Sequence, residues 1–295
     1  MHSTIAVVGP GAIGTTVAAA LHEAGRTPRI CGRTPRERLE LDAPGGRVVV
    51  PGPVLTDPAR AGGTAGIVFL AVKSTQIAGA APWLNALCGP GTVVCVLQNG
   101  VEQETMVAPH LPEGAGAVPS VVWFPAQAQP DGSVRLLGEA RLTLPDTDAS
   151  RAVLEALRGT RCSVELAEDF ASAAWRKLLQ NAVAGLMAVT GRRAGVFARA
   201  DVAELALAYL RECLLVARAE GAVLGDDVPR EVLAAFQAQP ADMGTSILAD
   251  REAGRPLEWD IRNGVVLRRG RARGIPTPIS ELLVPLLAAA SDGPG

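Results

Sequence analysis

The chain has 295 residues, 48% of them hydrophobic, and a formal net charge of −2 at pH 7. This composition excludes a disordered chain, and the lack of a basic excess argues against a nucleic-acid partner. We find no apolar run long enough to cross a bilayer, and we expect no signal peptide because the start lacks a charged region and a cleavage site. The length suffices for two domains, each with its own core.

The five cysteines are scattered along the chain and form no C-x-x-C pair. We therefore expect small buried thiols in a reducing cytoplasm rather than disulfides. The three histidines, His2, His22 and His110, lie far apart in sequence, so no metal site is expected. The sequence leaves the oligomeric state open, with a homodimer as one alternative.

The first segment has the pattern of a dinucleotide-binding turn. Four apolar residues, Ile5–Val8, precede a G-x-G-x-x-G run, and an Ala-rich helix is expected over 15–24. In this pattern the glycines permit a tight turn, the approach of a pyrophosphate and close helix packing, while the helix N-terminus attracts the phosphates. The alternative is a glycine-rich turn that binds nothing. The residues expected to hold the cofactor here are Gly9, Pro10, Gly11, Ala12, Ile13 and Gly14.

The second predicted strand, over 27–32, decides between the two nicotinamide cofactors. An NAD site carries an acidic residue at the end of this strand, which holds the ribose hydroxyls. Here that end reads Gly32-Arg33. A guanidinium can bind a 2′-phosphate through two hydrogen bonds, whereas a carboxylate would repel it. Arg33 therefore favours NADP (NADPH), while Arg36 and Arg38 are better explained as a solvated helix face.

Two buried strands are expected to carry polar residues to the same edge of a sheet. The apolar run over 66–72 ends at Lys73, and the run over 92–97 is followed by Gln98-Asn99-Gly100. Ligands of open α/β sheets bind outside the carboxyl ends of the strands. We therefore expect Lys73 and Asn99 to share one crevice, although an Asn-Gly pair alone is more often a simple turn.

The remaining pattern divides the chain near residue 167. Short strands are expected within 42–58 and at 117–124, 134–137, 141–144 and 163–166, with a helix over 149–158 and a hairpin turn at Asp131-Gly132. From Glu168 the hydrophobic period becomes helical, over 170–190, 201–220, 230–238, 245–252, 257–271 and 279–290. The fold class is therefore α/β, with a Rossmann-type doubly wound sheet over residues 1–167 and an all-α domain over residues 168–295.

Lysine is rare in this chain. Of the 28 basic residues 26 are Arg, and only Lys73 and Lys177 are Lys. A lysine retained against this bias fits a place where a compact ammonium is needed, because a guanidinium does not exchange its proton near neutral pH. Lys177 and Asn181 are spaced i, i+4 and so share one helix face. The alternative for that pair is a solvated face, as it is for Ser246 and Glu258.

Taken together, these motifs resemble the ketopantoate reductases, the 2-dehydropantoate 2-reductases of pantothenate synthesis. The resemblance rests on G-P-G-A-I-G at 9–14, Lys73, L-Q-N-G at 97–100, W-R-K-L-L-Q-N at 175–181, Ser246, E-W-D-I-R-N-G at 258–264 and G-I-P-T-P at 274–278. It covers essentially the whole chain. It implies an NADPH-dependent reduction of a small 2-keto acid to a 2-hydroxy acid.

The resemblance also implies roles for individual residues. Lys177 corresponds to the general acid, and Asn181 and Ser246 to substrate-binding residues. Asn99, Lys73 and Glu258 correspond to residues around the nicotinamide, its ribose and the reacting groups. An ammonium near the reduced carbonyl can stabilise and protonate the alkoxide, which agrees with the role of Lys177.

Three departures from the family pattern concern the substrate. Gly185 and Ser280 stand where the family usually or often has Asn, and the segment over 192–196 lacks a further Asn. We therefore expect weaker selection for the terminal hydroxyl of ketopantoate. The competing assignments are a β-hydroxyacid dehydrogenase and a non-catalytic NADP-binding sensor. The first is disfavoured because Ala171–Trp175 contains no glycine, and the second because both lysines, Ser246 and Glu258 are present.

Overall fold

A computed structural model describes residues 4–293 and divides the chain into two compact units. The first unit contains Met1–Gln98 and Glu102–Phe170, and the second contains Asn99–Val101 and Ala171–Gly295. Asn99–Val101, which the sequence placed with the sheet domain, therefore groups with the second unit. The two units are described in turn.

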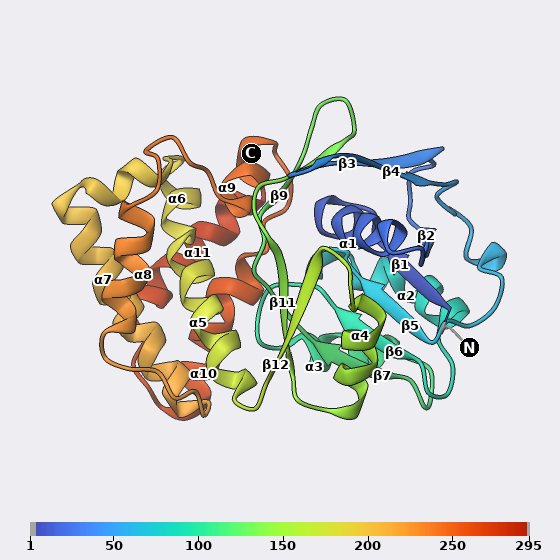
Figure 1. The fold of residues 1–295 in the computed structure, drawn as a ribbon. Helices are drawn as coiled ribbons and strands as arrows, with labels where there is room; N and C mark the ends of the chain where they lie inside the picture. The colour runs from blue at the N-terminus through green and yellow to red at the C-terminus, as the bar shows by residue number, and fades with distance from the viewer. Residues whose placement is uncertain (1–3, 294–295) are drawn as a thin grey trace. The chain divides into compact units, whose positions relative to one another are not determined.

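The first unit is built on a five-stranded parallel sheet, shown in Figure 1. Apolar side chains alternate along its strands: Val7 and Phe69 pack on one face, and Val8 and Leu70 on the other. The sheet is therefore buried on both sides, as its continuous apolar runs predict. Its order is β2 (Arg29–Cys31), β1 (Ile5–Val8), β5 (Ile67–Leu70), β6 (Val93–Val96) and β7 (Gly116–Pro119).

Helix α1 (Ala12–Glu23) lies between this sheet and a second one (Figure 1). Its buried residues, among them Val17 and Leu21, contact apolar residues of both sheets. The other face of the parallel sheet is covered by α2 (Ile77–Leu87). The second sheet has the order β4 (Gly46–Pro51), β3 (Arg38–Ala43), β10 (Val134–Leu136) and β9 (Ala126–Ala128).

The hairpin expected at Asp131-Gly132 is confirmed, because β9 and β10 pair antiparallel on either side of it. The single strand expected over 117–124 is wrong. It divides into β7 and β8 (Val121–Val122), which belong to different sheets. Ser120 lies between them and donates its hydroxyl to the Val96 carbonyl at 2.6 Å, which anchors the chain where it changes sheet.

A third sheet and a capped helix complete this unit. The sheet has the order β12 (Cys162–Ala167), β11 (Ala140–Pro145) and β8. Helix α4 (Asp148–Leu157) begins after Thr147, whose hydroxyl accepts a hydrogen bond from the Ser150 amide at 3.2 Å. The shorter helices are α3 (Gln103–Val107) and the 3-10 turns η1 (Pro58–Arg60), η2 (Ser74–Gln76) and η3 (Ala108–His110).

The second unit is built from helices, with no strand among its described residues. The helix expected over 170–190 is interrupted before Gly185, and the one expected over 257–271 contains a π-helical turn, η5 (Asp260–Gly264). Glycines in the left-handed conformation end α6 and α10: Gly191 has φ +67° and Gly274 has φ +65°. The helices are α5 (Phe170–Val183), α6 (Gly185–Thr190), η4 (Ala194–Ala198), α7 (Ala200–Ala219), α8 (Val228–Gln237), α9 (Ser246–Glu252), α10 (Val265–Arg273) and α11 (Pro278–Ser291).

None of the helices within residues 4–293 combines the length and the apolar character needed to cross a membrane.

Candidate active site

The turn after β1 has the geometry that a dinucleotide requires. Gly9 adopts φ +94°, which strongly favours glycine, and a Cβ built on Gly14 would lie 2.2 Å from the Gly9 carbonyl oxygen. No described atom lies within 4 Å of a Cβ built on Gly11, which is exposed and precedes α1. Having no side chain, Gly11 leaves the first N–H groups of α1 open to a phosphate. The residues of this turn therefore fit a dinucleotide cofactor.

Arg33 and Lys73 follow the two strands that flank β1. A Cβ on Gly32 would lie 2.8 Å from Pro10 Cδ, so the end of β2 packs against the glycine turn and places exposed Arg33 beside it. A Cβ on Gly9 would lie 2.8 Å from the Val72 amide nitrogen, so the residue before Lys73 packs against the same turn. This is the point at which the strand order reverses, where open α/β sheets bind their ligands.

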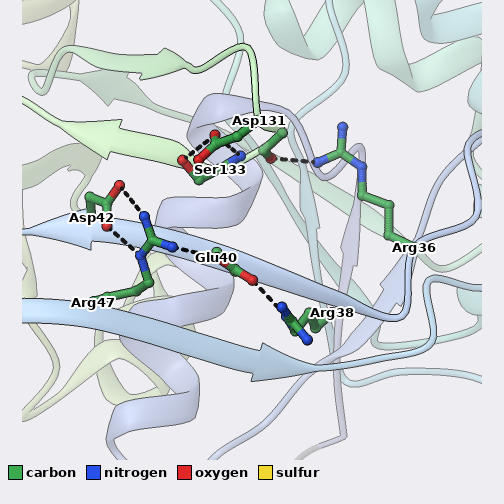
Figure 2. Close-up of polar contacts among 8 residues, drawn as sticks. Arg36, Arg38, Glu40, Asp42, Arg47, Asp131 and Ser133 are labelled. Carbon is green, nitrogen blue, oxygen red and sulfur yellow. Dashed lines mark hydrogen bonds and ion pairs between the residues drawn. The ribbon is translucent and has the colours of Figure 1, made fainter.

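Figure 2 shows that Arg36 and Arg38 are held by other groups of this unit. Arg36 donates to the Gly132 carbonyl at 3.2 Å, and Arg38 forms an ion pair with Glu40 at 2.6 Å. Arg38 begins strand β3, so the helix face expected for these two arginines is wrong. Both side chains are thus engaged within this unit, whereas Arg33 is exposed and follows Gly32, which packs against the glycine turn.

The same network extends along β3 and β4 (Figure 2). Arg47 contacts Asp42 at 2.7 Å and Glu40 at 2.9 Å, and its hydrogen bonds hold the pKa of Asp42 below the ordinary value. Asp131 accepts from the amide and hydroxyl of Ser133, which closes the hairpin between β9 and β10. These contacts support the sheet over α1.

In the second unit, α5 carries the lysine and asparagine expected to act on the substrate. Lys177 and Asn181 are both half-buried on this helix. Asn181 Nδ2 donates to Asn99 Oδ1 at 3.2 Å. The structure therefore brings Asn99 to Asn181 within the second unit. Asn181 lies one helical turn after Lys177.

The segment that contains Asn99 also reaches η5. A Cβ on Gly100 would lie 3.2 Å from the Ile261 carbonyl oxygen, so the Asn99-Gly100 backbone lies between α5 and the π-helical turn. Gly100 adopts φ +104°, a conformation that a side chain would oppose. Gly100 thus permits this segment to pack closely against Ile261 of η5.

Ser246 and Glu258 both contact Arg262, a residue to which the sequence analysis assigned no role. Arg262 on η5 is 2% exposed, and its Nη2 lies 3.1 Å from Ser246 Oγ and 3.5 Å from Glu258 Oε2. Glu258 is itself buried. The i, i+4 spacing of Glu258 and Arg262 was a signal of this contact, because residues so spaced share a helix face.

Comparisons with known proteins identify the family of this chain. Family models described as "Ketopantoate reductase PanE/ApbA" and "Ketopantoate reductase PanE/ApbA C terminal" match residues 5–149 and 169–291. A 2-dehydropantoate 2-reductase of Mycobacterium tuberculosis is 56% identical over 296 residues, all of both chains. The chain belongs to the ketopantoate reductase family.

Solved structures of the family share the fold. A ketopantoate reductase from Ralstonia eutropha JMP134 has a TM-score of 0.87 and 28% identity, covering 98% of each chain. A dimeric ketopantoate reductase from Staphylococcus aureus has a TM-score of 0.88 and 24% identity, covering 99% of this chain and all of that one. The predicted α/β fold class and family are confirmed, and the assignment to the β-hydroxyacid dehydrogenases is set aside.

Two departures from the ketopantoate reductase pattern have structural explanations. A Cβ on Gly185 would lie 2.8 Å from Asn263 Nδ2, so the side chain of Asn263 occupies the space beside Gly185. Asn263 is fully buried and donates to the Ala182 carbonyl at 2.8 Å and to the Tyr209 hydroxyl at 3.0 Å. An Asn at position 185 would therefore disturb this packing, so its effect on substrate selection could not be separated from its effect on folding.

Ser280 is the second departure, and it too is buried. Its amide and hydroxyl both donate to Glu212, the amide at 2.9 Å and the hydroxyl at 2.5 Å. The neighbouring Ile279 amide donates to the same carboxylate at 2.8 Å. Ser280 therefore joins α11 to α7.

Proposed function

We propose that this chain reduces 2-dehydropantoate, or a 2-keto acid close to it, to the 2-hydroxy acid with NADPH. The observation that carries this proposal is the pairing of Asn181 with Asn99 at 3.2 Å, one helical turn from Lys177. It brings two side-chain amides together one helical turn from a lysine, and a keto acid under reduction requires hydrogen-bond donors and a positive charge of this kind. The family and the name of the M. tuberculosis relative support the same substrate.

Lys177 serves as the general acid. As the carbonyl carbon is reduced, its oxygen gains negative charge, and an ammonium can both stabilise that charge and supply the proton. Asn99, Asn181 and Ser246 bind the substrate by hydrogen bonds. Glu258 and Lys73 contribute beside the reacting groups and the nicotinamide ribose.

The cofactor would be held by the first unit. Gly9, Gly11 and Gly14 shape the turn for the pyrophosphate, and the start of α1 offers its N–H groups. Arg33 would bind the 2′-phosphate. When bound, NADPH supplies the hydride.

Steady-state oxidation of NADPH with a panel of substrates tests this function. The panel contains 2-dehydropantoate, 2-ketoisovalerate, pyruvate and a 3-keto acid. We expect turnover with the branched 2-keto acids and kcat/KM highest for 2-dehydropantoate. NADPH binding without turnover of any of them would identify a sensor, and turnover of the 3-keto acid alone would contradict the proposed substrate class.

We also place the protein in the cytoplasm as a homodimer. All five cysteines are free and buried, which suits a reducing compartment. Leu282 and Leu286 are exposed and lie one turn apart on α11, forming an apolar stripe suited to a second copy. The S. aureus relative is named as dimeric. Light scattering on the unmodified chain and on Leu282→Glu tests the dimer: a monomer in the unmodified chain would contradict it.

A further inference from the structure

Arg262 is buried to a degree that is unusual for a guanidinium. It is 2% exposed and is among the largest fully buried side chains of residues 4–293. A buried charge is costly unless it is paired and its donors are satisfied. Arginine has five N–H donors in a planar fork, so a fully structural role would require several good acceptors.

The contacts of Arg262 fall short of that. Its Nη2 donates to Ser246 Oγ at 3.1 Å, and its distance of 3.5 Å to Glu258 Oε2 is long for a charge-assisted hydrogen bond. Its Nε is buried and has no hydrogen-bond partner among the described residues. The guanidinium thus retains donor capacity toward an acceptor that the chain itself does not supply.

Ser246 connects this buried cation to solvent. Ser246 is exposed, whereas Arg262 beneath it is not. Because the Ser246 hydroxyl oxygen accepts from Arg262, its own proton remains available to donate. The two side chains therefore present a cation and a neutral donor side by side, and both can donate to a carboxylate.

Arg262 and Ser246 are linked through neighbouring residues to the helix that carries Lys177. Arg262 directly follows Ile261, against which Gly100 packs, and the adjoining Asn99 bonds to Asn181 on the helix that carries Lys177. In a 2-keto acid the carboxylate is attached directly to the carbonyl carbon. Lys177 would supply one cation for the keto oxygen, and Arg262 a second for the carboxylate. Both residues belong to the second unit.

We propose that Arg262, with Ser246 as a second donor, binds the carboxylate of the 2-keto acid and sets the preference of the site for acids over neutral ketones. This inference rests on the proposed function and adds a substrate-binding residue to it. Since the carboxylate keeps its charge throughout the reduction, the interaction is equally strong before and during the chemical step. Its loss should therefore raise KM and leave kcat nearly unchanged.

The test compares 2-ketoisovalerate with its neutral amide, in the unmodified chain and in Arg262→Met and Arg262→Lys. For Arg262→Met we expect kcat/KM on the acid to fall about 10- to 100-fold through KM, as loss of a charge-assisted contact predicts. On the amide it should change less than about threefold, so that the acid-to-amide ratio falls. Arg262→Lys should recover part of the ratio, because it restores charge without the planar fork.

Two further variants keep the test decisive. Ser246→Ala, at an exposed position, should lower the same ratio severalfold even if Arg262→Met folds poorly. Arg251→Met is the matched control, because Arg251 is a half-buried arginine of the same unit that donates to the Ala188 and Val189 carbonyls. It should leave the ratio unchanged.

Equal losses on acid and amide in both Arg262→Met and Ser246→Ala would show that Arg262 only positions its neighbours, and would overturn the inference. Failure of the proposed function looks different, because the unmodified chain would then reduce neither compound. A calorimetric titration with the 2-hydroxy acid product adds a readout without turnover, and its affinity should weaken in Arg262→Met by the same factor as KM rises.

Discussion

Lys177 is the residue on which the proposed chemistry depends most. It is half-buried on α5, one turn before Asn181. Lys177→Ala should lower kcat by about 10²–10⁴ and leave NADPH affinity unchanged, because the lost proton donor acts only in the transition state. Lys177→Arg should not restore turnover, since a guanidinium is a poor acid near neutral pH. Stopped-flow turnover and fluorescence titration with NADPH measure the two effects.

The neighbouring Arg176 supplies a control for this substitution. Its side chain forms an ion pair with Glu231 on α8. Arg176→Ala should keep normal turnover, because surface ion pairs contribute little. Near-normal kcat in Lys177→Arg would show that the site needs positive charge alone.

Arg33 should determine the choice of cofactor. Arg33→Ala should remove most of the preference for NADPH over NADH, because the lost charge-assisted hydrogen bonds are worth about 1.5–3 kcal/mol. Arg38→Ala is the matched control, since Arg38 is paired with Glu40. Dissociation constants for both cofactors in the three proteins provide the measurement. Equal constants in the unmodified chain would contradict this account of Arg33.

At the scale of the element, two glycines of the turn between β1 and α1 should have different roles, Gly14 in stability and Gly11 in cofactor binding. A methyl group on Gly14 would collide with the Gly9 carbonyl, whereas one on Gly11 would meet no described atom within 4 Å, and Gly11 has φ −77°, which alanine tolerates. Gly14→Ala should therefore lower the Tm of the protein without cofactor. Gly11→Ala should keep that Tm and weaken NADPH binding, because its methyl group occupies the approach of the pyrophosphate. A Gly11→Ala variant with unchanged affinity would argue against binding at this turn.

The junction of α7 with α11 offers a test of stability independent of the site. Glu212 accepts three hydrogen bonds from Ile279 and Ser280 and is buried. Glu212→Leu should lower the free energy of unfolding by about 1–3 kcal/mol, because it leaves buried donors unsatisfied. Urea unfolding measures this, with the exposed Arg211→Gln as control. A change below about 0.5 kcal/mol would mean that water replaces the carboxylate.

The sequence predicted the features that short segments encode and missed those that depend on contacts between distant residues. Three features are encoded by short segments, and the structure contains them: the glycine turn, the apolar strand that ends near Lys73, and the i, i+4 pair on α5. The packing of Gly185 against Asn263 and of Ser280 against Glu212 depends on residues far apart in the chain, so no local pattern shows it. Strand β9 reads Ala-Gln-Ala, too short and polar to be recognised without its partner β10.

At the scale of the whole molecule, the cysteines should report on folding. Burial raises the pKa of Cys31 and Cys162 to about 12 and that of Cys88 to about 11. A thiol reacts as the thiolate, so at pH 8 the folded protein should react slowly with a disulfide reagent. All five thiols should react at once after unfolding in guanidinium. Rapid labelling of a cysteine in the folded protein would show local opening around that residue.

The π-helical turn η5 has a consequence for insertions and deletions. The Val265 amide donates to the Asp260 carbonyl five residues earlier, so this turn holds one residue more than an α-helical turn. Deleting one residue here would let the helix close as a regular α-helix, and the segments before and after the turn would keep nearly the same faces, because four residues then complete the turn that five complete now. Arg262 lies within this turn, so the deletion would shift its side chain away from Ser246 and Glu258 while α10 kept its packing. A length change that most helices could not absorb would here spare the fold and dismantle the site, so the chain length between Glu258 and Val265 is itself a functional constraint.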